Sequence, residues 1–390
     1  MVAVPPEARH RELEAAQEAL KARLRDIDPI HLQHRQAFIQ NSLADATKMH
    51  NGVPPFLQNL VEEQKKDEDI YDQYIRDATL HNQRAIRFQQ QMESPFASLP
   101  VLNDRFALVE LLGVSTSKVE VWKAADTYDN NSLVTLKISS DHHMIAYDHK
   151  ALARIDVHDT VVRVLRDGVL TTTFQDTQYS MYGLKYMDSN LETILLGCPN
   201  GRLPFLIAEA VAFQVAHCIQ HLCIEARVAH CDIRPANVLI TQPWNVAVCN
   251  FKSSRSRREL LPTIPHHKVN EMDASCVLYA APEYFNCLEA LGNTVTCDTA
   301  DVWALGVLFF VMIYGHHPLV PGLIVLDDAM KLSFVDHLRN YNGTISFPSF
   351  PSVPAYTQRV IQACLEKDPT KRLQSESLVT SGFIQRGGGE

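Results

Sequence analysis

The N-terminal part of the chain, residues 1–95, carries a mostly polar pattern with the period of a helix. Residues 8–25 are largely alanine, glutamate, leucine, arginine and lysine, and Leu13, Leu20 and Ile27 recur at seven-residue spacing, which favours a helix that ends near Asp28-Pro29. Residues 31–49 remain compatible with a helix until the turn signal at 51–55. A second polar helix is predicted over 56–91, where apolar residues form a discontinuous stripe.

This stripe allows two interpretations. The helix either packs one face against a neighbour and leaves the rest in solvent, or it belongs to an oligomerising coiled coil. A coiled coil needs about three or four heptads, and the run here is shorter, so the solvated helix is favoured.

The pattern changes after residue 95. Residues 106–110, 118–123 and 132–138 alternate or cluster apolar and β-branched residues between turn signals, which predicts strands. From Leu206 onward apolar residues follow helical spacing. Strands followed by helices indicate an α+β fold with a strand-rich small lobe and a helical large lobe.

Composition narrows the class of protein. The chain has 390 residues, 46% hydrophobic and 21% charged, which is typical of a globular protein. A net charge of -9 argues against direct nucleic-acid binding, because affinity for phosphates requires a basic field. The nine cysteines are odd in number and contain no C-x-x-C pair, so reduced core thiols are expected rather than a disulfide framework or a zinc site.

The sequence shows neither the pattern of a signal peptide nor that of a membrane-spanning helix. Residues 1–20 carry glutamates and arginines where a signal peptide requires an apolar block. The apolar run at 304–314 is shorter than the about 20 residues that span a bilayer. A soluble intracellular protein without membrane association is expected.

Residues 230–239 read His-Cys-Asp-Ile-Arg-Pro-Ala-Asn-Val-Leu and match the pattern H-x-D-x-[KR]-P-x-N. This segment resembles the catalytic loop of protein kinases. The resemblance makes Asp232 the candidate catalytic carboxylate, Arg234 the cation beside it and Asn237 a metal ligand. Cys231 stands where many kinases have an arginine that pairs with an activation-loop phosphate, so that mode of activation is not expected.

Residues 250–252 read Asn-Phe-Lys where the resemblance predicts Asp-Phe-Gly, 18 positions after Asp232. Asn250 replaces a carboxylate that binds magnesium, and a neutral amide oxygen is a poor ligand for a hard dication. Magnesium binding is therefore expected to be weak or absent. Lys252 replaces a glycine and adds both a side chain and a charge.

The expected nucleotide site contains residues of the small lobe. Residues 134–137, Val-Thr-Leu-Lys, match the strand motif V-A-I-K and make Lys137 the candidate ligand of the ATP phosphates. Residues 111–122 occupy the place of the glycine-rich loop; Gly113 is the glycine they retain, and Val121 follows it. Fewer glycines keep the backbone farther from the phosphates, so ATP binding is possible but loose.

Asp148 is the candidate partner of Lys137. It lies only 11 positions after the lysine, which is a short connection for a strand, a loop and a helix, and its side chain is one methylene shorter than glutamate. The short connection therefore argues against this ion pair, and Asp148 remains the candidate for it. Leu152, Ile155 and His158 are expected to mark the end of the helix.

Three positions characteristic of the large lobe of a kinase are retained. Glu283 follows Ala281-Pro282, Asp301 opens the segment 301–306, and Arg372 is placed to pair with Glu283. Since a buried charge is tolerated when it is paired, the retention of both partners indicates an intact fold. A bilobal kinase-like domain is expected over 104–385, with lobes of about 104–187 and 188–385.

Two alternatives remain for the basic residues between Asn250 and Glu283. A solvated loop is favoured over a phosphate-binding patch, and an acidic partner would also fit.

The junction at residues 94–113 identifies a subfamily. Its sequence, from Ser94-Pro95-Phe96 through Leu102-Asn103-Asp104-Arg105-Phe106 to Leu111-Leu112-Gly113, resembles the entry into the kinase domain of tousled-like kinases. The resemblance implies Ser/Thr specificity, nuclear rather than cytoplasmic residence, coiled-coil assembly with itself or another kinase, and partners related to chromatin and histone chaperones.

Three hypotheses follow. The favoured one is a tousled-like kinase fold with a weakened ATP and magnesium site, a pseudokinase that acts by binding and regulation. The second is an active Ser/Thr kinase, because Lys137, Asp232 and Asn237 are present. The third is a helical scaffold in which residues 1–95 carry the function.

Overall fold

The computed structural model describes residues 55–99, 101–115, 118–259, 264–285, 296–320 and 330–379. The helices predicted over 8–25 and 31–49 lie outside these residues. The predicted second helix is confirmed as α3 (Pro55–Glu93), which ends immediately before the Ser94-Pro95 turn.

The chain divides into two compact units. One contains residues 1–86 together with 196–201, and the other contains residues 87–195 and 202–390. Within the first unit, Gln73 on α3 accepts a hydrogen bond from the backbone N–H of Asn200 at 3.1 Å. Gly201 has a φ of +60°, and the Arg76 guanidinium fills the space where a Cβ would lie, so this position requires glycine.

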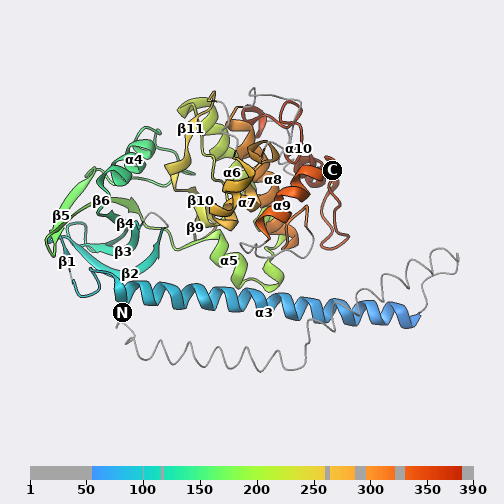
Figure 1. Ribbon diagram of the computed structural model, residues 1–390, viewed down its shortest axis with the longest axis horizontal. Helices are drawn as coiled ribbons and strands as arrows, with labels where there is room; N and C mark the ends of the chain where they lie inside the picture. Colours follow the sequence, from blue (N-terminus) through green and yellow to red (C-terminus); the bar gives the residue numbers. More distant parts are fainter. Residues whose placement is uncertain are drawn as a thin grey trace. The chain divides into compact units, whose positions relative to one another are not determined.

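The small lobe of the second unit is a six-stranded antiparallel sheet in the order β1-β2-β3-β4-β6-β5 (Figure 1). Three of its strands, β2, β3 and β4, lie near the predicted segments and are longer than predicted, whereas β1, β5 and β6 were not predicted. They are β1 (Val101–Leu102), β2 (Phe106–Val114), β3 (Glu120–Asp126), β4 (Ser132–Ser139), β5 (Leu170–Phe174) and β6 (Thr177–Lys185). Strand β4 buries Val134, Leu136 and Ile138 on one face and also Thr135 and Ser139 on the other, so both faces are largely covered.

The end of α3 is joined to this sheet. Phe96 is buried in the same core cluster as Trp122 and packs edge-on against Tyr179, with 4.9 Å between ring centroids. The Glu120 carboxylate accepts hydrogen bonds from Ser94 Oγ at 2.8 Å and from Trp122 Nε1 at 2.7 Å. The turn after α3 is therefore part of the small-lobe core.

Helix α4 (His142–Ala153) packs against β4 and β6 (Figure 1). It begins directly after the strand because Asp141 caps it, accepting the backbone N–H of Met144 at 3.0 Å. Leu152 lies in its last turn, but Ile155 and His158 lie beyond Ala153, so the predicted helix end was too late.

The large lobe is mainly helical, and together the lobes confirm the predicted α+β bilobal fold. Its helices are α5 (Leu191–Gly197), α6 (Phe205–His221), α7 (Ala274–Tyr279), α8 (Asp298–Tyr314), α9 (Lys331–Asn340) and α10 (Ala355–Cys364). Short strands are β7 (Ser189–Asn190), β8 (Val228–Ala229), β9 (Val238–Thr241), β10 (Asn245–Val248) and β11 (Arg255–Ser256). Single turns are η1 (Pro199–Gly201), η2 (Leu222–Ala226), η3 (Pro235–Asn237), η4 (Phe251–Ser253), η5 (His266–Glu271), η6 (Pro282–Phe285) and η8 (Ser375–Ser377).

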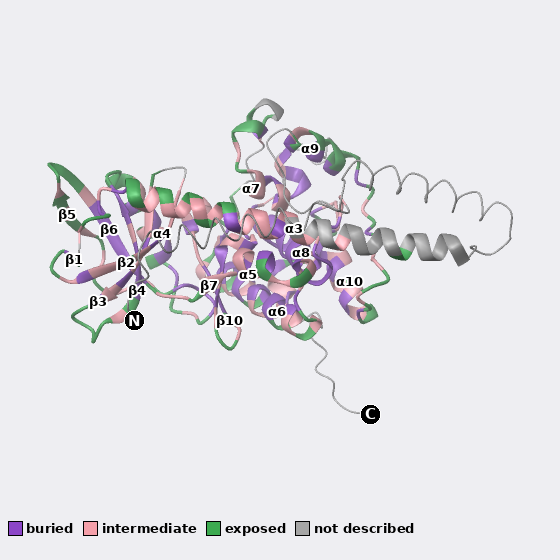
Figure 2. Cartoon of the chain, turned by 90° about the horizontal axis from the view of Figure 1, so that it is seen from below, coloured by how far each residue is buried: buried purple, intermediate pink, exposed green. Residues whose placement is uncertain are grey.

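Helix α8 is the buried centre of the large lobe (Figure 2). Its sequence is apolar on all sides, which is the pattern of a helix enclosed by others, and α6, α7 and α10 pack around it. It ends at Gly315, whose φ of +79° gives the left-handed cap that glycine adopts without strain.

One segment has the length and composition of a membrane span. Residues 205–226, which form α6 and η2, have a mean hydropathy of 1.3 in their most apolar window. Half of that window is buried inside the lobe, where α6 packs on α8 and β10, so the apolar character is that of a core helix.

A buried ion pair connects distant parts of the large lobe. Arg372 donates to both carboxylate oxygens of Glu283, at 2.6 and 2.9 Å, and its guanidinium lies over the Trp303 ring at 5.2 Å. It also donates to the carbonyl of Thr299 at 2.9 Å. The predicted pairing of Glu283 and Arg372 is therefore present, and the remaining guanidinium donors are satisfied as burial requires.

Asp301 connects α8 to the loop at 230–239. Its two carboxylate oxygens accept the backbone N–H of His230 at 2.6 Å and of Cys231 at 2.8 Å. Cys231 has a φ of +62°, a left-handed conformation that is strained for a residue with a side chain. The carboxylate holds the loop in this conformation. Burial outweighs the two donors and raises the pKa of Asp301 to about 7.

We predict that Arg372→Met lowers the free energy of unfolding by about 3–5 kcal/mol, because it leaves the buried Glu283 carboxylate without its partner. Chemical denaturation of the purified chain measures this loss. Lys371→Met is the matched control, since that side chain is 74% exposed and its ion pair with Asp368 contributes about 0–1 kcal/mol. Equal losses in the two variants would contradict the assigned role of the pair.

We also predict a pH dependence from Asp301. Its folded pKa of about 7 exceeds the ordinary value of 3.8, so its contribution to stability is complete below pH 3.8 and is lost as the pH rises to about 7. Denaturation between pH 4 and 7 should show the stability of the natural chain falling relative to that of Asp301→Asn. The exposed Asp336→Asn should leave the profile unchanged. Parallel profiles for the natural chain and Asp301→Asn would refute the assignment.

Candidate nucleotide and catalytic site

The ion pair that the sequence argued against is present. Lys137 Nζ lies 2.5 Å from Asp148 Oδ2, with both side chains largely buried. The expectation failed because the connection is very short: β4 ends at Ser139 and α4 begins at His142, so Asp148 lies in the second turn of the helix, facing the lysine. Two linking residues, Ser140 and the capping Asp141, are sufficient for the turn.

Tyr182 completes this cluster and could not be identified from the sequence. Its hydroxyl donates to Asp148 Oδ2 at 2.8 Å, and Lys137 and Tyr182 are directly paired across β4 and β6. Burial, followed by the neighbouring Asp148 charge, raises the pKa of Tyr182, so the hydroxyl stays protonated and acts as a donor. The other oxygen, Asp148 Oδ1, is buried and has no hydrogen-bond partner among the described residues.

The remaining candidate nucleotide residues lie on the neighbouring strands. Val121 is paired with Lys137 on β4 and with Gly113 on β2, so the three positions form one row across the sheet. Around Gly113 a Cβ would meet no atom within 4 Å. The structure therefore brings together Lys137, Val121 and Gly113, as the sequence predicts.

The candidate catalytic carboxylate of Asp232 is enclosed by neighbours from three segments. Its Oδ1 lies 3.1 Å from Arg234 Nε and accepts a hydrogen bond from Cys276 Sγ at 3.6 Å. Its Oδ2 accepts a hydrogen bond from Asn250 Nδ2 at 3.3 Å. The Asp232 side chain is 8% exposed. Both of its oxygens are therefore occupied by groups of the chain itself.

Asn250 joins the two other candidate residues. Its Nδ2 donates to Asp232 Oδ2 and also to Asn237 Oδ1, the latter at 3.1 Å. Asn237 uses its own Nδ2 to donate to the Asp232 carbonyl at 2.7 Å, so its Oδ1 must be an acceptor. Asn250 is thus placed between two acceptors, which fixes the orientation of its amide with the nitrogen inward.

This orientation is unfavourable for a cation. A magnesium ion needs several oxygen ligands, preferably anionic, at one point. Here the expected aspartate is replaced by an amide whose N–H donors point at the other two groups, and turning the amide over would place its oxygen against two acceptors. The residues present therefore fit the lysine contact to a phosphate better than they fit a magnesium ion.

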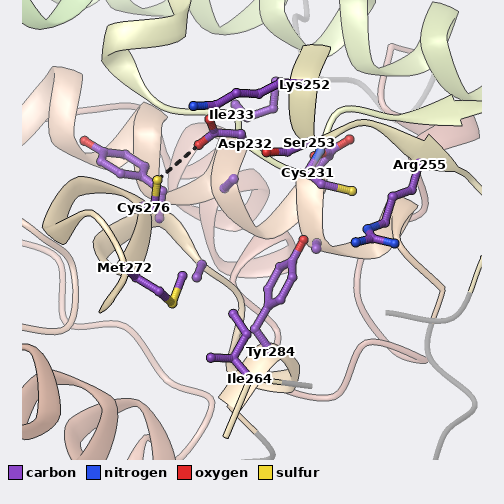
Figure 3. Close-up of a pocket in the computed structure, with 15 residues that line it drawn as sticks. Cys231, Asp232, Ile233, Lys252, Ser253, Arg255, Ile264, Met272, Cys276 and Tyr284 are labelled. Atoms are coloured by element: carbon purple, nitrogen blue, oxygen red, sulfur yellow. Dashed lines mark hydrogen bonds between the residues drawn. The ribbon is translucent and has the colours of Figure 1, made fainter. Parts of the chain in front are cut away.

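A cavity of about 330 Å³ lies beside Asp232, on the side of residues 252–284 (Figure 3). Figure 3 shows the Cys276 sulfur pointing at the Asp232 carboxylate from helix α7. Burial raises the pKa of the Cys276 thiol to about 12, and the Asp232 charge adds to this, so the thiol keeps its proton and donates it. Helix α7 thus presents an S–H group to the carboxylate.

The sequence did not identify Cys276 or helix α7. The helix spans only six residues, Ala274–Tyr279, which is too short for a clear hydrophobic period. The signal that could have found it is the capping residue Asp273, whose carboxylate accepts the backbone N–H of Ser275. Arg234 joins the same segment by donating to Ser275 Oγ.

Several basic residues that follow Asn250 are paired within the chain. Arg255 pairs with Glu259 at 2.6 Å, and Arg257 pairs with Glu376 and lies 3.7 Å from Asp298. Lys252 lines the cavity. Arg255 and Arg258 are exposed, as the favoured solvated loop predicts, and the ion pairs of Arg255 and Arg257 are an addition that the sequence did not predict.

Comparison with known proteins agrees with this geometry. Residues 115–384 match the sequence profile of the protein kinase domain. The chain is 26% identical over 240 residues to the serine/threonine-protein kinase TOUSLED of Arabidopsis thaliana, covering 60% of this chain and 34% of that protein. It is 21% identical over 343 residues to the human serine/threonine-protein kinase tousled-like 1, covering 84% of this chain and 43% of that protein.

A shorter relative is matched along most of its length. Cyclin-dependent kinase 2 of Caenorhabditis elegans is 22% identical over 334 residues, which cover 79% of this chain and 86% of that protein. The chain spans less than half of the length of the two tousled relatives. The domain match and the bilobal fold together show that the chain belongs to the protein kinase family and resembles its tousled-like serine/threonine members.

Proposed function

We propose that this chain is a pseudokinase, a tousled-like kinase homologue that acts by binding and regulating a protein partner rather than by transferring phosphate. The observation that supports this most directly is the Asn250 amide, which donates hydrogen bonds to both Asp232 and Asn237. In a kinase these three positions hold magnesium and orient the substrate hydroxyl. Here the same positions are satisfied by one another.

The amide of Asn250, in place of an aspartate, changes the electrostatics of the metal position. An aspartate at position 250 would face the Asp232 carboxylate across about a hydrogen-bond distance, and two such charges repel unless a cation lies between them. The amide converts that repulsion into attraction, so the network is stable without metal. A cation that entered would have to break two hydrogen bonds and would gain no additional negative ligand.

Asp232 is also obstructed on its other side. A substrate hydroxyl must donate to this carboxylate, and the Cys276 thiol already does so. Phosphate transfer would therefore require helix α7 to move as well as a metal to bind. Both requirements favour a binding function over catalysis.

A second candidate function is an active Ser/Thr kinase. The specific observation in its favour is the ion pair between Lys137 and Asp148, which orients the lysine as nucleotide binding requires. This pair supports retained ATP binding in either case, so the two functions differ at Asn250 rather than at Lys137.

The partner and location belong to the same proposal. The junction at 94–113 resembles tousled-like kinases, and Phe96 within it is part of the small-lobe core. On this basis we propose a nuclear protein partner related to chromatin, with a paralogous kinase as a possible second subunit. The proposed scaffold role of residues 1–95 falls mainly on residues outside those described.

We predict that ATP stabilises the natural chain against heat by nearly the same amount with and without magnesium. Lys137 supplies the phosphate contact, and Asn250 offers the metal no charge. Magnesium should change the affinity of the chain for ATP by less than about tenfold, which corresponds to ~1.4 kcal/mol. Thermal unfolding with ATP, with and without magnesium, measures it, and Lys137→Met should abolish the ATP shift itself. Phosphate transfer to acceptor proteins that disappears in Asp232→Asn would overturn the pseudokinase proposal.

We predict that Asn250→Asp reverses the metal dependence. The new carboxylate repels Asp232 in the absence of metal, so the variant should melt below the natural chain. Magnesium should then raise the affinity of the variant for ATP by more than about tenfold, ~1.4 kcal/mol, because an anionic ligand is restored. Asn250→Ala is the matched control, which loses the hydrogen bonds without gaining a charge. An identical magnesium response in both variants would show that position 250 does not govern metal binding.

A further inference from the structure

The cavity beside Asp232 has an amphipathic lining (Figure 3). Its volume of about 330 Å³ lies within the range of about 300–1,000 Å³ that is usual for small-molecule sites. Figure 3 shows Lys252 above the cavity and Arg255 at its right, whereas Met272 and Ile264 lie below. Cationic and apolar side chains therefore line different sides of the same cavity.

Lys252 is available to a ligand. Its side chain is half-buried on the cavity wall, and it forms no hydrogen bond or ion pair with the other residues that the structure describes. Arg255 pairs with Glu259 at 2.6 Å, but these side chains are 43% and 44% exposed, so water screens the pair and little is lost when it opens. The two cations therefore bring to the cavity a positive charge that the chain neutralises only in part.

The carboxylates on the cavity wall are occupied by other groups. Asp232 Oδ1 lies 3.1 Å from Arg234 Nε, and its Oδ2 accepts a hydrogen bond from Asn250 Nδ2 at 3.3 Å. The two oxygens of Asp301 accept backbone N–H groups at 2.6 and 2.8 Å. Neither carboxylate forms an ion pair with Lys252, so this lysine can receive an anion from outside the chain.

The apolar lining can enclose a hydrocarbon chain. Ala300 and Ala304 lie four positions apart on one face of α8 and are 4% and 5% exposed. Because their side chains are small, they leave room for a ligand in front of the helix. Ile264 and Met272 add apolar surface, and the unbranched Met272 can adapt its shape to a bound chain. Burial of a hydrocarbon against these residues is favourable.

We propose that this cavity is a binding site for a small amphiphilic anion, a medium-chain carboxylic acid. Its carboxylate pairs with Lys252, and its alkyl chain lies along Met272, Ile264 and the alanines of α8. A single negative charge matches one unpaired lysine, whereas the two charges of a phosphate monoester would be repelled by the neighbouring Asp232. The site goes beyond the proposed binding of a protein partner and depends neither on that function nor on ATP.

Decanoate is the probe for this site. It is titrated into the purified full chain by isothermal titration calorimetry, below the concentration at which it forms micelles, and in parallel by thermal unfolding. The expected result is saturable binding at one site, with a melting temperature that rises with decanoate concentration. Decanol has the same chain without the charge, and acetate has the charge without the chain, so each should bind at least about tenfold more weakly.

Three variants locate the binding. Lys252→Met keeps an unbranched side chain but removes the charge, so decanoate should bind about tenfold more weakly, because a hydrogen bond between charged groups is lost. Lys268→Met is the matched control, since Lys268 is exposed and does not line the cavity. Met272→Trp fills the cavity and should abolish the binding of both decanoate and decanol.

Four results would overturn the proposal. In the natural chain these are the absence of saturable decanoate binding and equal affinities for decanoate and decanol. In the variants they are a Lys252→Met chain that loses no more affinity than Lys268→Met, and a Met272→Trp chain that binds decanoate as tightly as the natural one. The two results from the natural chain decide the question even if a variant fails to fold.

Discussion

The carboxylate of Asp301 is the constraint on which the rest of the site depends. It is buried in α8, the central helix, and it fixes the two backbone N–H groups that precede Asp232. Without these bonds nothing described would hold Cys231 in its left-handed conformation, and the direction of the Asp232 side chain would be lost. The positions of Arg234 and Asn237 follow from the same anchor, because both belong to this short loop.

A second constraint operates at the position of the metal. Buried polar groups are stable when each donor has an acceptor. The amides of Asn237 and Asn250 find their acceptors in Asp232 and in each other. A kinase site built from two carboxylates and one amide meets it only when a cation is bound. On the proposed function, the single change from carboxylate to amide removes the need for a cation at this position.

Local spacing predicted the bilobal fold and the strand with Lys137, and the resemblance to protein kinases predicted the loop with Asp232 and the pair of Glu283 with Arg372. The sequence failed for the ion pair of Lys137 with Asp148, where spacing alone could not show that Asp141 caps a helix immediately after β4. It also missed Tyr182 and Cys276. These residues approach the site through tertiary packing from β6 and α7, and no sequence period records such contacts.

The distribution of the retained residues explains how a kinase fold can survive a change in its chemistry. Arg372 and Asp301 are enclosed by groups that would be left unpaired if either were lost, at a cost of several kcal/mol against a total stability of about 5–15 kcal/mol. The amide of Asn250 satisfies Asp232 and Asn237, whereas an aspartate there would repel Asp232. Folding alone therefore preserves the first two residues and, without metal, favours the amide over a carboxylate at position 250. The intact Glu283–Arg372 pair thus belongs to the requirements of folding, and residue 250 belongs to the proposed loss of metal binding.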